Sequence, residues 1–160
     1  MAGPDGSAAG PGGQSRLDAR EAAALEQPFD ADGLYALRAA VAAHAGRFDL
    51  PDDQLDDLLI VAGELATNAI RHGGGSGRLR LWRVGSTLRC QVTDRGPGIT
   101  DPTLGDTPPD PTDTGGRGLW ICRQLSDSLT IRPGDHGRGT TITAVIRVRR
   151  GSRAGAATRG

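Results

Sequence analysis

PDDQLDDLLIVAGELATNAIRH, residues 51–72, decides the fold because it predicts one long helix with a single apolar face. Pro51 suits the first helical position, where its missing N–H would be unpaired in any case. Carboxylates follow in the first turns, where the positive end of the helix dipole favours them: Asp52, Asp53 and Asp56. Apolar side chains recur at three- and four-residue steps: Leu55, Leu58, Ala62, Leu65 and Ala69. The glycines after His72 end the helix.

Glu64 and Asn68 are the polar residues of this helix that suggest chemistry. They are four positions apart, so they stack on one face about 6 Å apart along the axis, beside the apolar stripe. A carboxylate and an amide at the edge of a buried surface are well placed to hold a metal-bound ligand. Taken alone, such a pair is more often part of a solvated helix surface, so the rest of the chain must decide between the two readings.

Length, net charge and composition narrow the class of protein. A length of 160 residues with zero net charge suggests one domain and gives no reason to expect a nucleic-acid partner. The absence of a bilayer-length apolar run and of a signal-peptide pattern predicts a soluble cytoplasmic protein without a membrane partner. Cys90 and Cys122 have no metal or redox spacing and are interpreted as small buried thiols. Every cation is arginine, which excludes a P-loop, whose motif needs lysine.

The two ends differ in composition from the interior. Residues 1–19 and 151–160 are rich in small residues and have little to bury, so we expect disordered tails around a domain at 20–150. A short edge strand is weakly signalled between Ala22 and Phe29. Asp30 or Asp32 is expected to cap a helix at about 33–47. His44 on that helix is interpreted as a packing residue.

A hairpin follows the long helix. Residues 78–84 alternate, Gly85-Ser86 forms a two-residue turn, and residues 87–94 return. Asp94 shares a face with the apolar side chains of the returning strand, so it points inward, where an unpaired carboxylate costs several kcal/mol. The following Gly96-Pro97-Gly98 allows close backbone approach. This turn is either a tight loop or the wall of a ligand site.

Residues 100–114 have no periodicity and are rich in Pro, Asp, Thr and Gly, which predicts a mobile loop, either a linker or a lid. The loop leads into a glycine-rich turn at 115–118 and a short helix ending near Ser126. Unpaired N–H groups and the helix dipole suit a phosphate there. Arg117 is expected either to bridge phosphate oxygens or to be solvated.

Two closing strands are predicted at 128–132 and 140–149. Thr140 points to the same side as Asp94, whereas Trp82 points outward and either caps the open sheet surface or marks a partner site. Four strands with one apolar and one polar face need helices on one side. The expected fold is therefore an α+β two-layer sandwich with a mixed, mainly antiparallel sheet.

The inward polar groups together fit a purine triphosphate between the helices and the sheet. Asp94, helped by Thr140, would accept from the adenine amino group. The amide oxygen of Asn68 would bind a Mg²⁺ that bridges phosphates, and the turn at 115–118 would hold the phosphate chain. Glu64 would orient or deprotonate an attacking hydroxyl.

Four motifs resemble those of the GHKL ATPases, the superfamily of gyrase-type, chaperone and histidine-kinase ATP-binding domains. ELATNAIRH at 64–72 resembles the N box, and the three glycine boxes are matched by DRGPG at 94–98, GRGL at 116–119 and GTT at 139–141. The motifs occur in order and span about Phe29 to Val148. Besides Asn68, Asp94 and Thr140, the resemblance assigns these residues to the nucleotide: His72, Gly96, Gly98, Gly116, Arg117, Gly118 and Leu119.

The form E-L-x-T-N-A-x-x-H is most similar to bacterial anti-sigma factor serine/threonine kinases. This resemblance implies a Bergerat-type sandwich that uses ATP and Mg²⁺. It also implies phosphorylation of a serine on an anti-anti-sigma (STAS-domain) protein by a kinase that sequesters a sigma factor. Members of that family commonly form homodimers.

Three alternatives remain. A detached histidine-kinase-type ATPase domain would accompany a phospho-acceptor His followed by an acid, and His44 is followed by Ala45. A gyrase- or chaperone-like ATPase would carry further domains. A non-catalytic, ATP-dependent regulatory module needs no base, so the presence of Glu64 favours phosphoryl transfer.

Overall fold

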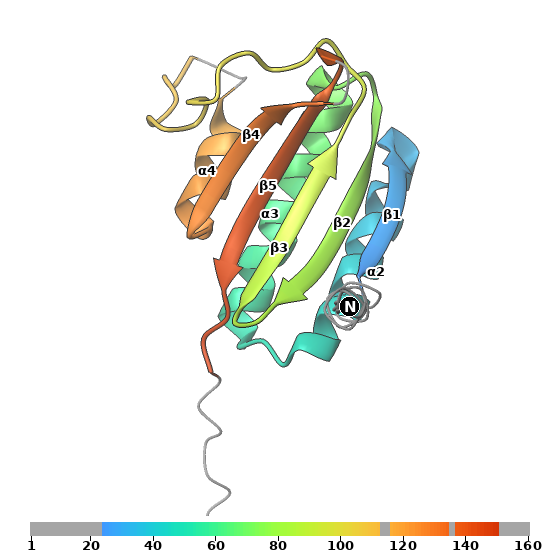
Figure 1. Ribbon diagram of the computed structural model, residues 1–160, viewed down its shortest axis with the longest axis vertical. Coiled ribbons are helices and arrows are strands. Elements are labelled where there is room, and N and C mark those ends of the chain that lie inside the picture. Colours follow the sequence, from blue (N-terminus) through green and yellow to red (C-terminus); the bar gives the residue numbers. More distant parts are fainter. Residues whose placement is uncertain (1–23, 113–115, 135–136, 151–160) are drawn as a thin grey trace, which may run out of the picture.

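The computed structural model describes residues 24–112, 116–134 and 137–150, which form a five-stranded sheet with helices on one face (Figure 1). The strands are β1 (Leu25–Asp30), β2 (Ser76–Val84), β3 (Thr87–Thr93), β4 (Ser128–Pro133) and β5 (Thr140–Arg147). They lie in the order β1-β2-β3-β5-β4. The helices are α2 (Leu34–Ala45), α3 (Asp52–His72) and α4 (Arg117–Leu125). The predicted α+β two-layer sandwich is confirmed, although each pairing of these strands is antiparallel rather than mixed.

Helix α3 lies across the sheet between α2 and α4 (Figure 1). Four residues of the predicted stripe are buried, Leu58, Ala62, Leu65 and Ala69, and Val61 and Ala66 are buried beside them. Leu55 is partly buried, because it lies near the start of the helix. Pro51 precedes the first helical residue rather than occupying it. Its ψ of 148° is extended, and its carbonyl accepts the first helical hydrogen bond from Leu55 N at 3.0 Å.

The segment before α3 follows the predicted order. The weakly signalled edge strand is present as β1, whose Phe29 pairs with Gly77 of β2. Of the two candidate caps it is Asp30 whose carboxylate accepts from the N–H groups of Asp32 and Gly33, so it begins the turn that leads into α2. His44 packs edge-on against Phe48, with ring centroids 5.3 Å apart.

The core lies between the helices and the inner sheet face and contains both cysteines. Cys90 on β3 and Cys122 on α4 are buried free thiols, as predicted. Burial raises the pKa of Cys90 to about 12 and also raises the pKa of Cys122. Neither thiol is therefore a ready nucleophile at neutral pH.

Trp82 lies on the outer face of β2 but is 6% exposed. The guanidinium of Arg80 lies 4.6 Å from its ring centroid. This burial favours the interpretation of Trp82 as a cap on the sheet surface.

Two expectations concern residues at the ends of the chain or its relation to a membrane. The predicted disordered tails, 1–19 and 151–160, lie outside the described residues. Within the described part of the chain, no helix is both long and apolar enough to span a bilayer.

Gln54 is a buried polar residue that the sequence patterns did not indicate. Its amide Nε2 donates to the carbonyl of Arg147 at 2.7 Å, and its Oε1 accepts from Arg149 N at 2.8 Å. The first turn of α3 is thereby tied to the end of β5.

Replacing Gln54 by alanine should lower the free energy of unfolding by about 2 kcal/mol, because two backbone groups lose partners in a water-poor position. Urea unfolding followed by circular dichroism measures the change. Gln124→Ala on the exposed side of α4 is the control and should stay within about 0.5 kcal/mol of the unchanged protein. Equal stability of the two variants would contradict this account of Gln54.

Candidate functional site

Two adjoining cavities open between α3 and the start of α4. The first, here called the Asn68 cavity, has a volume of about 530 Å³ and is lined by Asn68, His72, Pro97, Gly98, Ile99, Thr100, Asp101, Leu104, Gly116 and Leu119. The second, here called the Glu64 cavity, has a volume of about 410 Å³ and is lined by Glu64, Thr67, Arg71, Pro111, Arg117, Gly118 and Ile121. Helix α3 lines both cavities because Glu64 and Asn68 lie one turn apart. The first turn of α4 also lines both.

Most of the residues singled out in the sequence line one of these cavities. Asn68, His72, Gly98, Gly116 and Leu119 line the Asn68 cavity. Glu64, Arg117 and Gly118 line the Glu64 cavity. The other three, Asp94, Gly96 and Thr140, line neither. Gly96 is the first residue of the turn at 96–99, and Asp94 and Thr140 hold that turn by hydrogen bonds.

Asp94 is the buried carboxylate at the end of β3 and is 6% exposed. Its Oδ1 accepts from Gly96 N at 3.0 Å and from Thr140 N at 3.2 Å. The predicted need for donors is thus met by backbone N–H groups. No described residue donates to its second oxygen, Oδ2, which packs against Gly73 after the end of α3.

Thr140 connects the end of β5 to the same turn. Its Oγ1 accepts from Ile99 N at 2.9 Å, while its carbonyl accepts from Asp94 N at 3.0 Å. Gly139 N donates to the carbonyl of Gly96 at 2.8 Å. The 96–99 turn is therefore held by hydrogen bonds to the beginning of β5, and Ile99 from this turn faces the Asn68 cavity.

Gly96 is required by the close approach of this turn to the end of α3. A Cβ on Gly96 would lie 2.5 Å from Gly73 Cα, and a Cβ on Gly73 would overlap with Asp94 Cγ. Sequence reasoning assigned Gly73 only the role of ending the helix. It missed this contact because Gly73 and Asp94 belong to segments that meet only in the folded chain.

Gly118 allows the proposed base to approach α4. A Cβ on Gly118 would lie 2.6 Å from Glu64 Oε2, so the half-buried carboxylate of Glu64 lies against the backbone of the first turn. Within the described part of the chain no side chain caps α4, and its first helical hydrogen bond is donated by Trp120 N to the carbonyl of Gly116 at 3.2 Å. The N–H groups before Trp120 have no partner within the helix and favour an anion.

The loop after the 96–99 turn contains residues that the motifs missed, among them Asp101 and Leu104 of the Asn68 cavity. As expected, residues 100–112 form no helix or strand. Asp101 Oδ1 accepts from the N–H and hydroxyl of Thr103, which lowers the pKa of the Asp101 carboxyl. Asp110 and Thr112 repeat the arrangement, and the twofold Asp-Pro-Thr triplet could have indicated both turns.

The chain belongs to the family of histidine kinase-like ATPase domains, which residues 28–146 match. The resemblance to GHKL ATPases is thereby confirmed for family and fold, and ATP is the ligand that this class of domain implies. Curated proteins give no significant sequence match.

Solved structures with this fold include kinase domains and complexes. The SiaB–SiaC complex from Pseudomonas aeruginosa is similar with a TM-score of 0.60 and 12% identity, over 83% of this chain and 95% of that one. The RsbU and RsbW domains of Rv1364c from Mycobacterium tuberculosis give a TM-score of 0.59 and 18% identity, over 78% of this chain. This chain spans about a third (32%) of that one. The mycobacterial sensor histidine kinase MprB gives a TM-score of 0.51 and 19% identity, over 78% of this chain and 99% of that one. At these identities the likeness shows the fold alone.

A protein-only metal centre is not formed by the described residues, since they contain no group of three or more His, Cys, Asp or Glu side chains placed to hold an ion. Asn68 is a single amide at the cavity wall. This donor set fits a Mg²⁺ that arrives with the nucleotide, because Mg²⁺ keeps several waters and is commonly bound through one or two side chains and substrate phosphates.

Gly139→Ala should destabilise the protein more than Gly137→Ala, although both glycines have positive φ, 76° and 72°. A Cβ on Gly139 would overlap with the carbonyl oxygen of Asp94, whereas none of the surrounding atoms lies within 4 Å of a Cβ on Gly137. Both substitutions cost about 1–2 kcal/mol of backbone strain. Overpacking at Gly139 should add about 1–3 kcal/mol. Urea unfolding of both variants measures the difference, and equal costs would show that the Gly139–Asp94 contact is dispensable.

Proposed function

We propose that this chain is an anti-sigma factor serine/threonine kinase. It binds Mg·ATP in the Asn68 cavity, phosphorylates a serine of an anti-anti-sigma (STAS-domain) partner and sequesters a sigma factor. The observation that carries the proposal is the position of Glu64. Its carboxylate lines the Glu64 cavity, lies against the first turn of α4, and is one helical turn from Asn68, which lines the other cavity.

The Asn68 cavity suits an adenine nucleotide. Its volume of about 530 Å³ lies within the range of small-molecule sites, ~300–1,000 Å³. Apolar walls are provided by Ile99, Leu104 and Leu119. Asp94 Oδ2 is the acceptor available behind the turn for the adenine amino group, and the Thr140 hydroxyl supports it, directly or through a water.

The phosphate chain is assigned to the side of the cavity where α3 and α4 meet. His72 and the free N–H groups at the start of α4 favour negative charge there. Asn68 supplies an amide oxygen to the Mg²⁺ that accompanies the phosphates. Arg117, at the wall of the Glu64 cavity, is within the region that the terminal phosphate would occupy and offers a bidentate cation.

Glu64 is assigned the proton transfer. ATP supplies the phosphoryl group, and the acceptor hydroxyl enters through the Glu64 cavity. Glu64 accepts the hydroxyl proton while the oxygen–phosphorus bond forms and the bond to the bridging oxygen of ADP breaks. The close contact with Gly118 limits the positions of this carboxylate, which keeps it oriented for the transfer.

A protein partner is supported by two kinds of observation. The motif E-L-A-T-N-A-I-R-H is most similar to anti-sigma factor kinases. Two structures of the same fold contain SiaB with SiaC, and an RsbW domain with an RsbU domain. The rival assignment, an ATP-dependent module without transfer, differs from the proposal in requiring no base at position 64.

Glu64→Gln should lower phosphoryl transfer by about 10²–10⁴-fold, because the amide cannot accept the proton. The affinity for Mg·ATP should stay within about threefold, since the base contributes little to ground-state binding. Transfer of labelled phosphate from ATP to candidate STAS-domain proteins, with calorimetry for binding, separates the two effects. Undiminished transfer by Glu64→Gln would remove Glu64 as the base. Nucleotide binding without label on any partner would favour the non-catalytic module.

Asp94→Asn should weaken binding of Mg·ATP by about 10–100-fold. The amide has one acceptor fewer, and its NH₂ group faces either backbone donors or the adenine amino group. Calorimetry measures the dissociation constant, and Asp56→Asn on the exposed side of α3 is the matched control. Identical affinities of the two variants would place the adenine elsewhere.

A further inference from the structure

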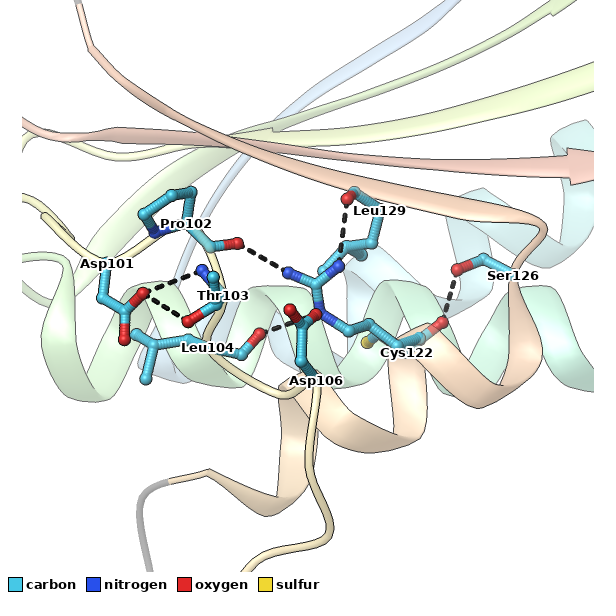
Figure 2. Close-up of polar contacts among 9 residues, drawn as sticks. Asp101, Pro102, Thr103, Leu104, Asp106, Cys122, Ser126 and Leu129 are labelled. Atoms are coloured by element: carbon cyan, nitrogen blue, oxygen red, sulfur yellow. Dashed lines mark hydrogen bonds and ion pairs between the residues drawn. The ribbon is translucent and has the colours of Figure 1, made fainter.

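Arg123, at the end of α4, makes an unusual set of contacts for a residue that no motif indicated. Its side chain is 18% exposed. The guanidinium Nη2 donates to the carbonyl of Pro102 at 2.8 Å, and Nε donates to the carbonyl of Leu104 at 2.9 Å. Arg123 Nε also lies 2.9 Å from Asp106 Oδ1. Figure 2 shows Pro102, Leu104 and Asp106 of this loop close together, with dashed lines drawn from the carbonyl oxygens of Pro102 and Leu104.

The same guanidinium also reaches the sheet. Its Nη1 donates to the carbonyl of Leu129 on β4 at 3.2 Å (Figure 2). One side chain therefore joins the loop segment 102–106, helix α4 and strand β4. Three carbonyls and one carboxylate around a single cation match the planar fork of guanidinium donors. A lysine ammonium has three donors on one atom and cannot span these positions.

Gly105 brings the backbone of this segment onto α4. Its φ is +81°, and a Cβ there would lie 2.7 Å from the carbonyl carbon of Leu119 and 2.8 Å from Trp120 N. The segment is thus in direct backbone contact with the first turns of the helix, while Arg123 holds it from the last turn. Arg123 contacts the carbonyl of Leu104 itself, and Gly105 is the next residue, so both attachments act at or beside Leu104.

The other hydrogen bonds that the described residues make in this segment are local, as are those of Thr103 to the Asp101 carboxylate. Within it, Asp106 N donates to the carbonyl of Thr103 at 2.9 Å, and Leu104 N is 3.5 Å from the carbonyl of Asp101. These turns shape the loop but do not attach it to the domain. Since residues 100–112 have no helix or strand, the position of the segment against the core depends on Arg123 and Gly105.

The position of this segment matters because Asp101 and Leu104 line the Asn68 cavity together with Leu119 of α4. We propose that Arg123 is a positioning residue for nucleotide binding, which holds Leu104 in place as a wall of the cavity. The inference rests on the proposed binding of Mg·ATP there. Arg123 itself does not line the cavity and acts through the loop backbone.

The expected change in the dissociation constant for Mg·ATP follows from the fraction of molecules in which the loop is docked. If loss of Arg123 leaves the segment docked for about 1–10% of the time, the dissociation constant rises about 10–100-fold, in proportion to the lost population. Asp106→Asn removes the ion pair but keeps the carbonyl contacts of Arg123. This change should raise the dissociation constant by about two- to threefold, because a half-exposed ion pair contributes little.

The test compares Arg123→Ala and Arg123→Lys with Arg89→Ala, which removes an exposed arginine from the outer face of β3. Calorimetry with Mg·ATP should show a 10–100-fold weaker affinity for both Arg123 variants, without rescue by lysine, and no change for Arg89→Ala. At saturating ATP the rate of phosphoryl transfer should match that of the unchanged protein, while KM for ATP rises. If Arg123 only stabilised the fold, its substitution would lower the melting temperature and leave the affinity of the folded protein for Mg·ATP unchanged. That result would overturn the proposal.

Amide hydrogen exchange of the protein without nucleotide gives an independent measurement. Arg123→Ala should accelerate exchange at Asp106, whose N–H bonds within the segment, and leave the amides of β3 and β5 unchanged. Unchanged exchange at Asp106 would also overturn the proposal. Binding of ATP without transfer to any partner would instead contradict the kinase assignment, and the affinity comparison among the arginine variants would still decide the role of Arg123.

Discussion

The carboxylate of Asp94 is the interaction on which the rest of the candidate site depends. One oxygen accepts from both Gly96 and Thr140, so the end of β3, the glycine turn and the beginning of β5 converge at a single buried atom. Gly73, after the end of α3, packs against the same carboxylate, and Gly139 packs against its backbone. Four chain segments meet around the side chain and backbone of Asp94. Gly73, Gly96 and Gly139 have no side chain, which leaves room for this close packing. The 96–99 turn, with its backbone thus restrained, can present Ile99 and Gly98 to the cavity.

Helix α3 provides the second half of the site through its register. Its apolar stripe fixes the rotation of the helix on the sheet, and Glu64 and Asn68 are carried to the edge of that contact. Helix α4 packs beside α3 and brings Gly118 against Glu64. The proposed separation of roles, with ATP binding on one side and proton transfer on the other, is a consequence of where two helices meet.

The loop between β3 and α4 is organised differently from the rest of the domain. Its side chains contribute to the Asn68 cavity, yet it has no regular structure of its own between residues 100 and 112. Its attachment relies on one guanidinium that satisfies carbonyls from the loop and from β4. The proposed role of Arg123 follows from this arrangement, because the guanidinium contacts the loop backbone and does not itself line the cavity.

The sequence by itself determined the class of fold, and most of the site residues that it indicated line one of the two cavities. Local periodicity is sufficient to predict α3, the β2–β3 hairpin and the inward direction of Asp94, because side-chain direction repeats every 3.6 residues in a helix and every two in a strand. The glycine motifs indicated that the backbone approaches another group closely, but they did not identify that group. Tertiary structure alone decided that Asp94 and Thr140 support the turn, that Gly73 and Gly118 contact carboxylates, and that Gln54 and Arg123 bind distant carbonyls. The reason is that these contacts join residues far apart in the chain, whose partners depend on how elements pack and not on any local pattern.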